Sequence, residues 1–213
     1  TRGGTEVGVQ SSNNQARAGG SAQPSNQVDV TEDGARAVAA AISLCSEIPE
    51  AWANSPGLYK IIANESGGIV GRVNYALKSY MEQNGISHDQ IASDIQRNVF
   101  YYKHCCRVTS QSTREARENG LPACDRQRQS GLMDHTRAQA NAGVSGYGHV
   151  AGMCTSAAGI GQLLNRNMHA YQPSGVRGFN DASQELCGMM RYIKDRYGNP
   201  DRAWARYVQG LGY

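Results

Sequence analysis

The chain has 213 residues and a formal net charge of +3. This length suffices for one domain with a buried core plus a tail. No apolar run is long enough to span a bilayer, so a membrane span is not expected. The charge is small, and acidic residues are mixed with the arginines of residues 107–137. A nucleic-acid partner is not favoured, because such proteins usually carry a basic stripe.

The N-terminal segment, residues 1–28, is poor in large apolar side chains and rich in Gly, Ser, Asn and Gln. Such a segment cannot bury enough surface to offset the entropy lost on ordering. We therefore predict a tail that is flexible by itself or ordered by a partner protein, followed by a folded domain over residues 29–213.

Helical periodicity and capping signals dominate the rest of the chain. Thr31 is a predicted N-cap, and Ser87 with Gln90 has the pattern of a capping box. Helices are predicted, in chain order, over residues 31–45, over residues 56–66, after Ser87, over residues 157–168, over residues 183–197 and from Pro200. Alternating strand patterns are nearly absent. The sequence predicts a mainly α fold with Gly-rich loops at residues 67–71 and 143–152.

Six cysteines leave the redox state open. They are Cys45, Cys105, Cys106, Cys124, Cys154 and Cys187. An even number permits disulfides, but a chain of this length does not need them for stability, and we expect buried free thiols. There is no C-x-x-C pair or zinc-finger spacing, so neither a metal site nor a cofactor is expected.

Glu65 is the strongest candidate for a catalytic residue. Leu58, Ile61, Ile62 and Glu65 follow one another at i, i+3, i+4 and i+7, so one helix face carries three aliphatic groups and then a carboxyl. Partial burial would raise the pKa of this carboxyl and keep it protonated near neutral pH, as a general acid requires. The alternative is a solvated glutamate at a frayed helix end.

Four motifs together resemble the lytic transglycosylase family, which includes soluble lytic transglycosylases and goose-type-lysozyme-like proteins. The resemblance is nearest to domains found in phage virion proteins, and it covers residues 56–71 and 155–213. The motifs are Glu65-Ser66-Gly67-Gly68, Ser156-Ala157-Ala158-Gly159-Ile160-Gly161-Gln162, Tyr192-Ile193-Lys194-Asp195-Arg196-Tyr197-Gly198 and Ala203-Trp204-Ala205-Arg206-Tyr207.

The resemblance implies a lysozyme-like helical domain that cleaves the bond between N-acetylmuramic acid and N-acetylglucosamine in peptidoglycan. Glu65 would be the single acid and base, with a 1,6-anhydro product. A hydrolase would need a second carboxylate or an ordered water. Candidates for the second carboxylate are Asp181, Glu185 and Asp195. The expected substrate contacts are Ser66, Ser156, Gly159, Gln162 and Tyr207.

Each of these contacts also has a structural interpretation. Ser66 and Ser156 could cap helices instead. Gly159, like Gly161, could permit close approach of the backbone to the glycan or of two helices to one another. Tyr207 could be a core aromatic residue rather than a cleft residue.

Two departures from the family pattern bear on function. Glu65 and Ser156 are separated by 91 positions, so residues 76–150 resemble a helical insertion that covers the cleft or docks on a partner. Val208 stands where the family has Asn, which could weaken recognition of the sugar.

The resemblance implies a virion-associated enzyme that acts on the host cell wall or in the periplasm during genome entry. Its partners would be glycan strands and other virion proteins, contacted through residues 1–28 and 76–150. The first alternative is an inactive peptidoglycan-binding or virion structural protein on the same scaffold. The second is a scaffold or nucleic-acid-associated capsid protein.

Overall fold

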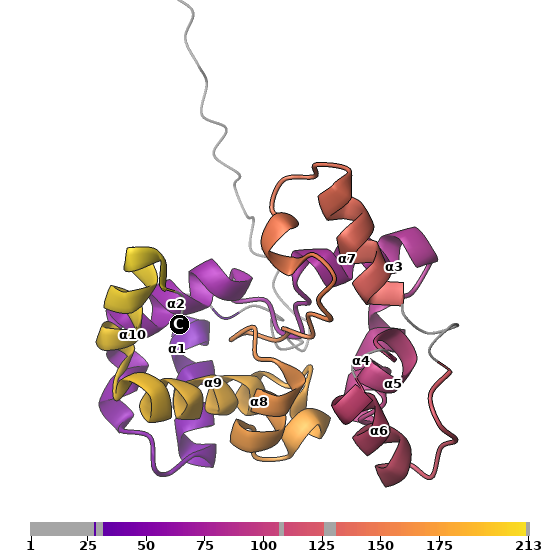
Figure 1. Ribbon diagram of the computed structural model, residues 1–213. Helices are drawn as coiled ribbons and strands as arrows, with labels where there is room; N and C mark the ends of the chain where they lie inside the picture. Colours follow the sequence, from indigo (N-terminus) through magenta and orange to yellow (C-terminus); the bar gives the residue numbers. More distant parts are fainter. Residues whose placement is uncertain (1–27, 29–31, 107–108, 126–130, 212–213) are drawn as a thin grey trace, which may run out of the picture.

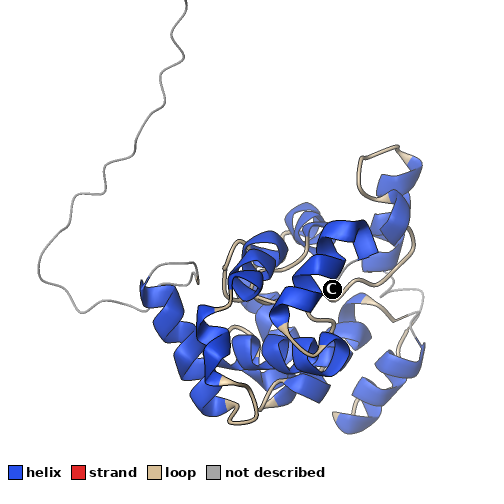
Figure 2. Ribbon diagram, turned by 90° about the vertical axis from the view of Figure 1, so that its left-hand side faces the viewer, coloured by secondary structure: helices blue, strands red, loops and turns tan. Residues whose placement is uncertain are grey.

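The computed structural model describes residue 28 and residues 32–106, 109–125 and 131–211. Within these ranges the chain is mainly α-helical, as predicted, and its extended pairing is limited to isolated bridges (Figure 2). None of the helices in this part combines the length and the apolar character that crossing a bilayer requires. The predicted tail lies outside the described residues except for Val28, and so does the predicted cap Thr31.

The helices follow the chain from α1 near the N-terminal end to a short π-helix near the C-terminal end. The α-helices are α1 Glu32–Leu44, α2 Pro56–Ser66, α3 Tyr75–Asn84, α4 His88–Gln96, α5 Phe100–His104, α6 Thr109–Glu118, α7 Gly131–Asn141, α8 Asn165–Tyr171, α9 Ala182–Tyr197 and α10 Pro200–Arg206. The shorter elements are η1 Glu50–Asn54, η2 Gly148–Val150, η3 Gly175–Gly178 and the π-helix η4 Tyr207–Leu211.

The described helices fall into two groups (Figure 1). The first group is α1, α2, α9 and α10, and its core contains Leu58, Ile61, Leu186 and Met189. The second group is α3 to α7, which fall within or beside the segment predicted as a helical insertion. Its core extends from α3, α4, α5 and α7 to α8 and η3. The two groups are therefore built on separate apolar clusters.

Local capping signals account for several helix boundaries. The Ser55 hydroxyl accepts a hydrogen bond from the Leu58 N–H, 3.3 Å away, at the start of α2. Gly67 ends α2 in the left-handed conformation, with φ of 61°. The predicted capping box at the start of α4 is present, with Ser87 and Gln90 bonded in both directions.

The predicted helix over residues 157–168 is wrong over residues 157–164. Helix α8 begins only at Asn165, and the preceding residues form a tight turn. Gly159 and Gln162 have φ of 79° and 46°, which no right-handed helix allows. The turn also pairs with the chain after α2, since the Gly159 N–H donates to the Arg72 carbonyl over 2.7 Å. These long-range bonds replace the helical ones.

The expectation of free thiols is also wrong. The six cysteines form three disulfides, Cys45–Cys187, Cys105–Cys154 and Cys106–Cys124. Their Cα–Cα distances are 5.9, 5.8 and 5.8 Å, inside the range that a disulfide can bridge. The adjacent Cys105 and Cys106 bond to different partners, because neighbouring side chains point in different directions. Sequence spacing alone could not identify the pairs, since folding brings them together.

The Cys45–Cys187 disulfide should contribute strongly to stability because it joins the end of α1 to α9 across 142 positions of sequence. We expect the Cys45→Ala, Cys187→Ala double variant to lose about 2–4 kcal/mol of unfolding free energy, measured by denaturant titration. Removing Cys106–Cys124, which spans 18 positions, should cost less, because the loop it closes in the unfolded chain is shorter. Equal stability of the first variant and the wild type would contradict the expectation.

Candidate active site

Glu65 lies in the last turn of α2, at the end of a fully apolar face. Leu58, Ile61 and Ile62 are at most 1 % exposed, so the first three positions of the predicted stripe are buried in the core. The glutamate itself is half-buried. Burial raises the pKa of Glu65 to about 7, so near neutral pH a substantial fraction of this carboxyl carries its proton.

Glu65 lines a cavity of about 1070 Å³ that is walled by segments far apart in the sequence. Gln162 and Tyr207, both predicted as substrate contacts, line the same cavity. The other lining residues come from the chain after α2, from α3 and from the region between α3 and α8. They are Ile69, Val70, Gly71, Arg72, Val73, Asn74, Tyr75, Lys78, Met81, Glu82, Ile86, His88, His149 and Ala157.

A second, smaller cavity of about 200 Å³ also contains Glu65 and Gln162. Two arginines, Arg166 and Arg196, line it as well, together with Asn167 and Tyr192. The two cavities therefore share Glu65 and Gln162 as wall residues.

The turn that carries Gln162 is fixed by a buried carboxyl, Glu185 of α9. This side chain is 1 % exposed and accepts hydrogen bonds from the backbone N–H groups of Gly71, Ile160 and Asn180 over 2.7–3.1 Å. Burial raises the pKa of Glu185 to about 7, and the three N–H donors limit that rise because they stabilise the ionised form. Glu185 thus ties the chain after α2 to the Gly159–Gln162 turn.

Gly159 contacts this carboxyl rather than the cavity. A Cβ atom at position 159 would lie 2.9 Å from the carboxyl carbon of Glu185, closer than packing allows. Its φ of 79° also disfavours any side chain. Of the two interpretations of Gly159, the structure therefore favours close packing, here against a helix.

Gln162 and Tyr207 are each held in place at the cavity. The Gln162 amide donates to the carbonyl oxygens of Arg72 and Gly159, both over 2.9 Å. The Tyr207 ring stacks on Trp204, with centroids 5.5 Å apart and planes 13° apart. Burial and the nearby charge of Glu65 raise the pKa of Tyr207, which indicates that the two side chains are close.

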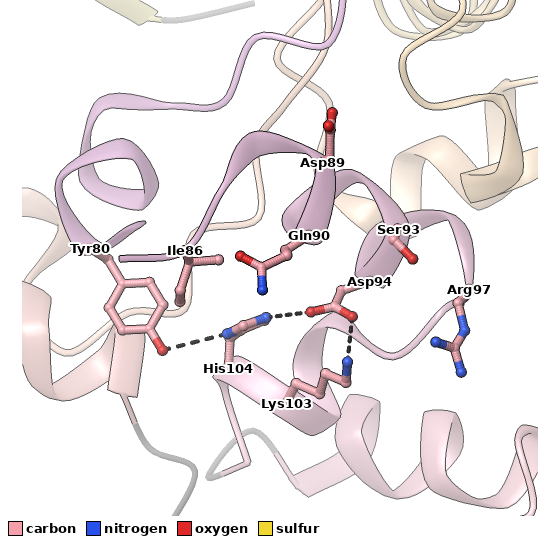
Figure 3. Close-up of a pocket in the computed structure, with 9 residues that line it drawn as sticks. All are labelled: Tyr80, Ile86, Asp89, Gln90, Ser93, Asp94, Arg97, Lys103 and His104. Atoms are coloured by element: carbon pink, nitrogen blue, oxygen red, sulfur yellow. Dashed lines mark hydrogen bonds and ion pairs between the residues drawn. The ribbon is translucent and has the colours of Figure 1, made fainter. Parts of the chain in front are cut away.

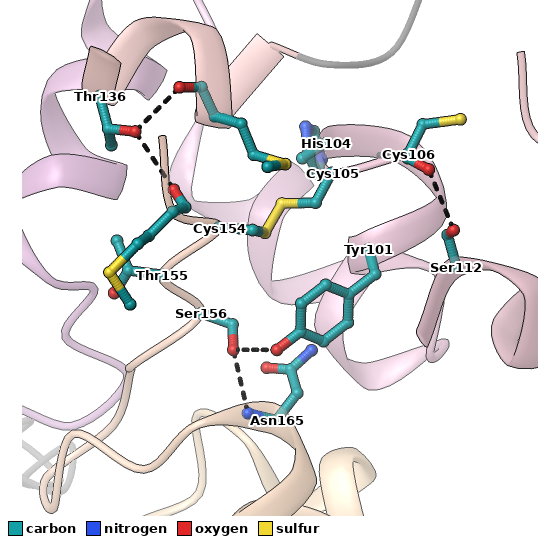
Figure 4. The surroundings of a disulfide bond; sticks show 12 residues. Tyr101, His104, Cys105, Cys106, Ser112, Thr136, Cys154, Thr155, Ser156 and Asn165 are labelled. Atoms are coloured by element: carbon teal, nitrogen blue, oxygen red, sulfur yellow. Dashed lines mark hydrogen bonds between the residues drawn. A yellow bond between two sulfur atoms is a disulfide. The ribbon is translucent and has the colours of Figure 1, made fainter. Parts of the chain in front are cut away.

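Ser66 and Ser156 do not line either cavity. Both are fully buried. The Ser66 hydroxyl donates to the Ile62 carbonyl and accepts from the Gly68 N–H at the end of α2. The Ser156 hydroxyl bonds to the Tyr101 hydroxyl and accepts from the Asn165 N–H at the start of α8 (Figure 4). These contacts match the capping interpretation, and the predicted substrate contacts at both serines are not supported.

The three carboxylates considered as partners of Glu65 have other contacts. Glu185 is enclosed by backbone donors, Asp181 caps α9 by accepting from the Gln184 N–H, and Asp195 accepts from the Tyr171 hydroxyl. None of them lines a cavity that contains Glu65. The other carboxyl in the larger cavity is Glu82 of α3, which sequence reasoning missed and which pairs with Lys78 over 3.8 Å.

A separate cavity of about 630 Å³ lies on the second helix group (Figure 3). Asp94 of α4 accepts hydrogen bonds there from Lys103 and His104 of α5 over 2.6 and 2.9 Å. Burial alone would raise the pKa of Asp94, but its bonds to His104 and Lys103 hold the pKa below its usual value. These bonds join α4 to α5, and we interpret the cluster as structural.

Comparisons of the chain with models of known protein families, with curated proteins and with solved structures find no match. The arrangement around Glu65 therefore has to be interpreted from its own geometry and chemistry.

Burial of Glu65 should make the protein less stable as pH rises. The folded-state pKa is about 7 against an ordinary value of 4.5, so between these values the folded state binds more protons than the unfolded state. Stability then falls as pH rises through this window. Glu65→Gln lacks this titration, and we expect it to exceed the wild type by about 1–3 kcal/mol above pH 7.

The measurement is the unfolding free energy of wild type and Glu65→Gln at pH 4 and pH 8. The other buried glutamates are common to both proteins, so the difference isolates Glu65. A constant difference at the two pH values would show that the carboxyl is not desolvated.

Proposed function

We propose that this protein cleaves the glycan strands of peptidoglycan, with Glu65 as its single acid and base. The main support is the position of Glu65, a half-buried carboxyl with a pKa of about 7 in a cavity that also contains Gln162 and Tyr207. The three residues come from three of the four motifs that carry the resemblance to lytic transglycosylases. A cavity of this size suits several linked sugars rather than one small metabolite.

The proposed reaction uses one carboxyl twice. Protonated Glu65 donates its proton to the oxygen between N-acetylmuramic acid and N-acetylglucosamine as the bond from that oxygen to C1 breaks. The resulting carboxylate then accepts the proton of the muramic acid C6 hydroxyl, whose oxygen bonds to C1. The products are a 1,6-anhydro end and a free 4-hydroxyl, and Glu65 is protonated again.

The non-hydrolytic outcome is supported by the positions of the other carboxylates. A hydrolase that activates water or forms a covalent intermediate uses a second carboxylate near the bond. Asp181, Glu185 and Asp195 all bond elsewhere. Glu82 lines the larger cavity with Glu65, but it belongs to α3 on another wall segment and pairs with Lys78 over 3.8 Å. The Tyr207 hydroxyl and the Gln162 amide would instead orient the sugar beside Glu65.

The alternative of an inactive, glycan-binding protein rested on Val208 and on the long insertion. Val208 is 61 % exposed and is not among the residues that line the cavities with Glu65. The replacement of Asn at this position therefore removes no group from the cavity walls. This favours the active enzyme.

The three disulfides bear on where the protein acts. Disulfides persist in oxidising compartments such as the periplasm, the cell surface and virions, and they are rare in a reducing cytosol. We propose that the protein acts outside the cytosol, on the host cell wall, as part of a virion.

Glu65→Gln should lose activity without losing binding. The amide is nearly the same size as the acid but cannot transfer the proton, so we expect the rate of turbidity clearing of purified cell walls to fall at least about 100-fold. Co-sedimentation with the walls should stay unchanged. Glu50→Gln, an exposed glutamate in η1, is the matched control and should clear walls at the wild-type rate.

Clearing at the wild-type rate by Glu65→Gln would refute the role of this carboxyl. Binding of both proteins without clearing by either would establish the inactive alternative. Mass spectrometry of the released fragments separates the two reactions, because anhydro ends indicate a transglycosylase and reducing ends a hydrolase.

The clearing rate should fall at alkaline pH. The acid form of Glu65 is needed to start the reaction, and burial raises its pKa to about 7. Above that pH the rate should drop roughly tenfold per pH unit, because the protonated fraction does so. A rate measured from pH 5 to pH 9 that rises through this interval would exclude Glu65 as the acid.

A further inference from the structure

One aromatic ring in the Glu65 cavity has no role in the proposed reaction. Tyr75 is the first residue of α3 and lines the cavity together with Glu65 and Tyr207. Its side chain is 47 % exposed, although large aromatic residues normally bury most of their surface. The exposed face of the ring therefore lies at the cavity and is not used for packing.

The Tyr75 ring is held from two sides by the insertion. Its hydroxyl donates to the Gly146 carbonyl, and the Nε2 atom of His149 lies 3.4 Å from the same hydroxyl. The ring meets Tyr147 edge to face, with centroids 5.4 Å apart and planes 86° apart. Tyr147 is 5 % exposed and packs in a small apolar cluster with Ala76 and Val150. The ring is thus exposed but fixed.

The segment behind the ring is tied to the rest of the site. The Thr136 hydroxyl donates to the Met153 carbonyl, and the next residue, Cys154, forms a disulfide with Cys105 (Figure 4). The Asn74 side chain caps α3 and also donates to the carbonyls of Thr155 and Ala157. The position of Tyr75 relative to the Gly159–Gln162 turn is therefore set before any ligand binds.

The chemistry of this wall suits a sugar. A pyranose ring presents C–H groups on its faces and hydroxyl or acetamido groups on its edge, so it needs a flat apolar surface with polar groups around it. Tyr75 offers the surface, and His149, Lys78 and Glu82 line the same cavity. A protein or a lipid surface would require a wider apolar patch than one ring surrounded by polar and charged side chains.

We propose that Tyr75 and His149 form a saccharide-binding subsite that holds a sugar of the glycan strand away from the bond that Glu65 cleaves. This inference rests on the proposed function, since it assumes that the cavity binds glycan. The subsite gives the protein a preference for long strands, because a longer chain fills more of the cavity of about 1070 Å³ that Glu65 and Tyr75 both line. The insertion thereby contributes part of the substrate cleft.

The test is a binding measurement on protein that cannot cleave. Glu65→Gln is titrated by calorimetry with the β-1,4-linked hexamer and dimer of N-acetylglucosamine. Adding Tyr75→Ala should weaken hexamer binding roughly tenfold, since one stacked sugar is lost, and should leave dimer binding unchanged. Tyr75→Phe in the same background keeps the ring and should retain most of the affinity.

Met153→Ala is the matched control. The Met153 side chain is exposed in the segment that leads from His149 to Cys154, and it does not line the cavity. Its hexamer affinity should equal that of Glu65→Gln alone. Thermal unfolding checks that Tyr75→Ala folds, and alanine suits the first turn of a helix. Unchanged hexamer binding by the Tyr75→Ala protein, or no hexamer binding by Glu65→Gln, overturns the subsite.

Wall clearing and hexamer binding together distinguish failure of the subsite from failure of the proposed function. Cell walls cleared by the wild type, with hexamer binding independent of Tyr75, would refute the subsite alone. Hexamer binding that depends on Tyr75, in a protein that does not clear walls, would refute catalysis and leave the subsite standing.

Discussion

The buried carboxyl of Glu185 is the contact on which the rest of the candidate site depends. It receives backbone N–H groups from three separate segments, at Gly71, Ile160 and Asn180. These segments are the chain after α2, the turn before α8 and the chain before α9. A charged or polar group is stable inside a protein only when it is fully hydrogen-bonded, so none of the three can move away without leaving a buried group unsatisfied. The positions of Glu65 and Gln162 relative to each other follow from this constraint.

Half-buried Glu65 and fully buried Glu185 both have a pKa raised to about 7, but their surroundings assign them opposite roles. Backbone donors surround Glu185, which therefore cannot exchange a proton with a ligand in the cavity. Burial is the one cause of the rise at Glu65, and this residue lines two cavities. A desolvated carboxyl that still reaches a ligand is costly for folding and useful for proton transfer. That contrast is the physical basis for choosing Glu65.

Sequence patterns predicted the features that depend on residues close together in the chain. The caps and glycines that bound α2 and α4, and the apolar face ending at Glu65, follow from residues three or four positions apart. The turn at Gly159 was missed because its bonds run to Arg72, and the disulfides were missed because their partners meet only in the folded chain. The segment 76–150 was predicted to cover the cleft or to dock on a partner, but which of its residues line the cavity could not be predicted for the same reason. Nothing near Tyr75 in sequence indicates that Tyr147 and His149 hold its ring.

Two of the disulfides join elements that form the cavity walls, so the rigidity of these walls depends on an oxidising compartment. Cys105–Cys154 joins the second helix group to the segment that leads into the Gly159–Gln162 turn, and Cys45–Cys187 joins α1 to α9, the helix that carries Glu185. Both covalent links therefore act on elements that position the cavity walls. In a reducing cytosol these links would be absent, and the walls would be held by packing and hydrogen bonds alone. Oxidising conditions are therefore the ones in which both links form and the cavity walls are fully fixed.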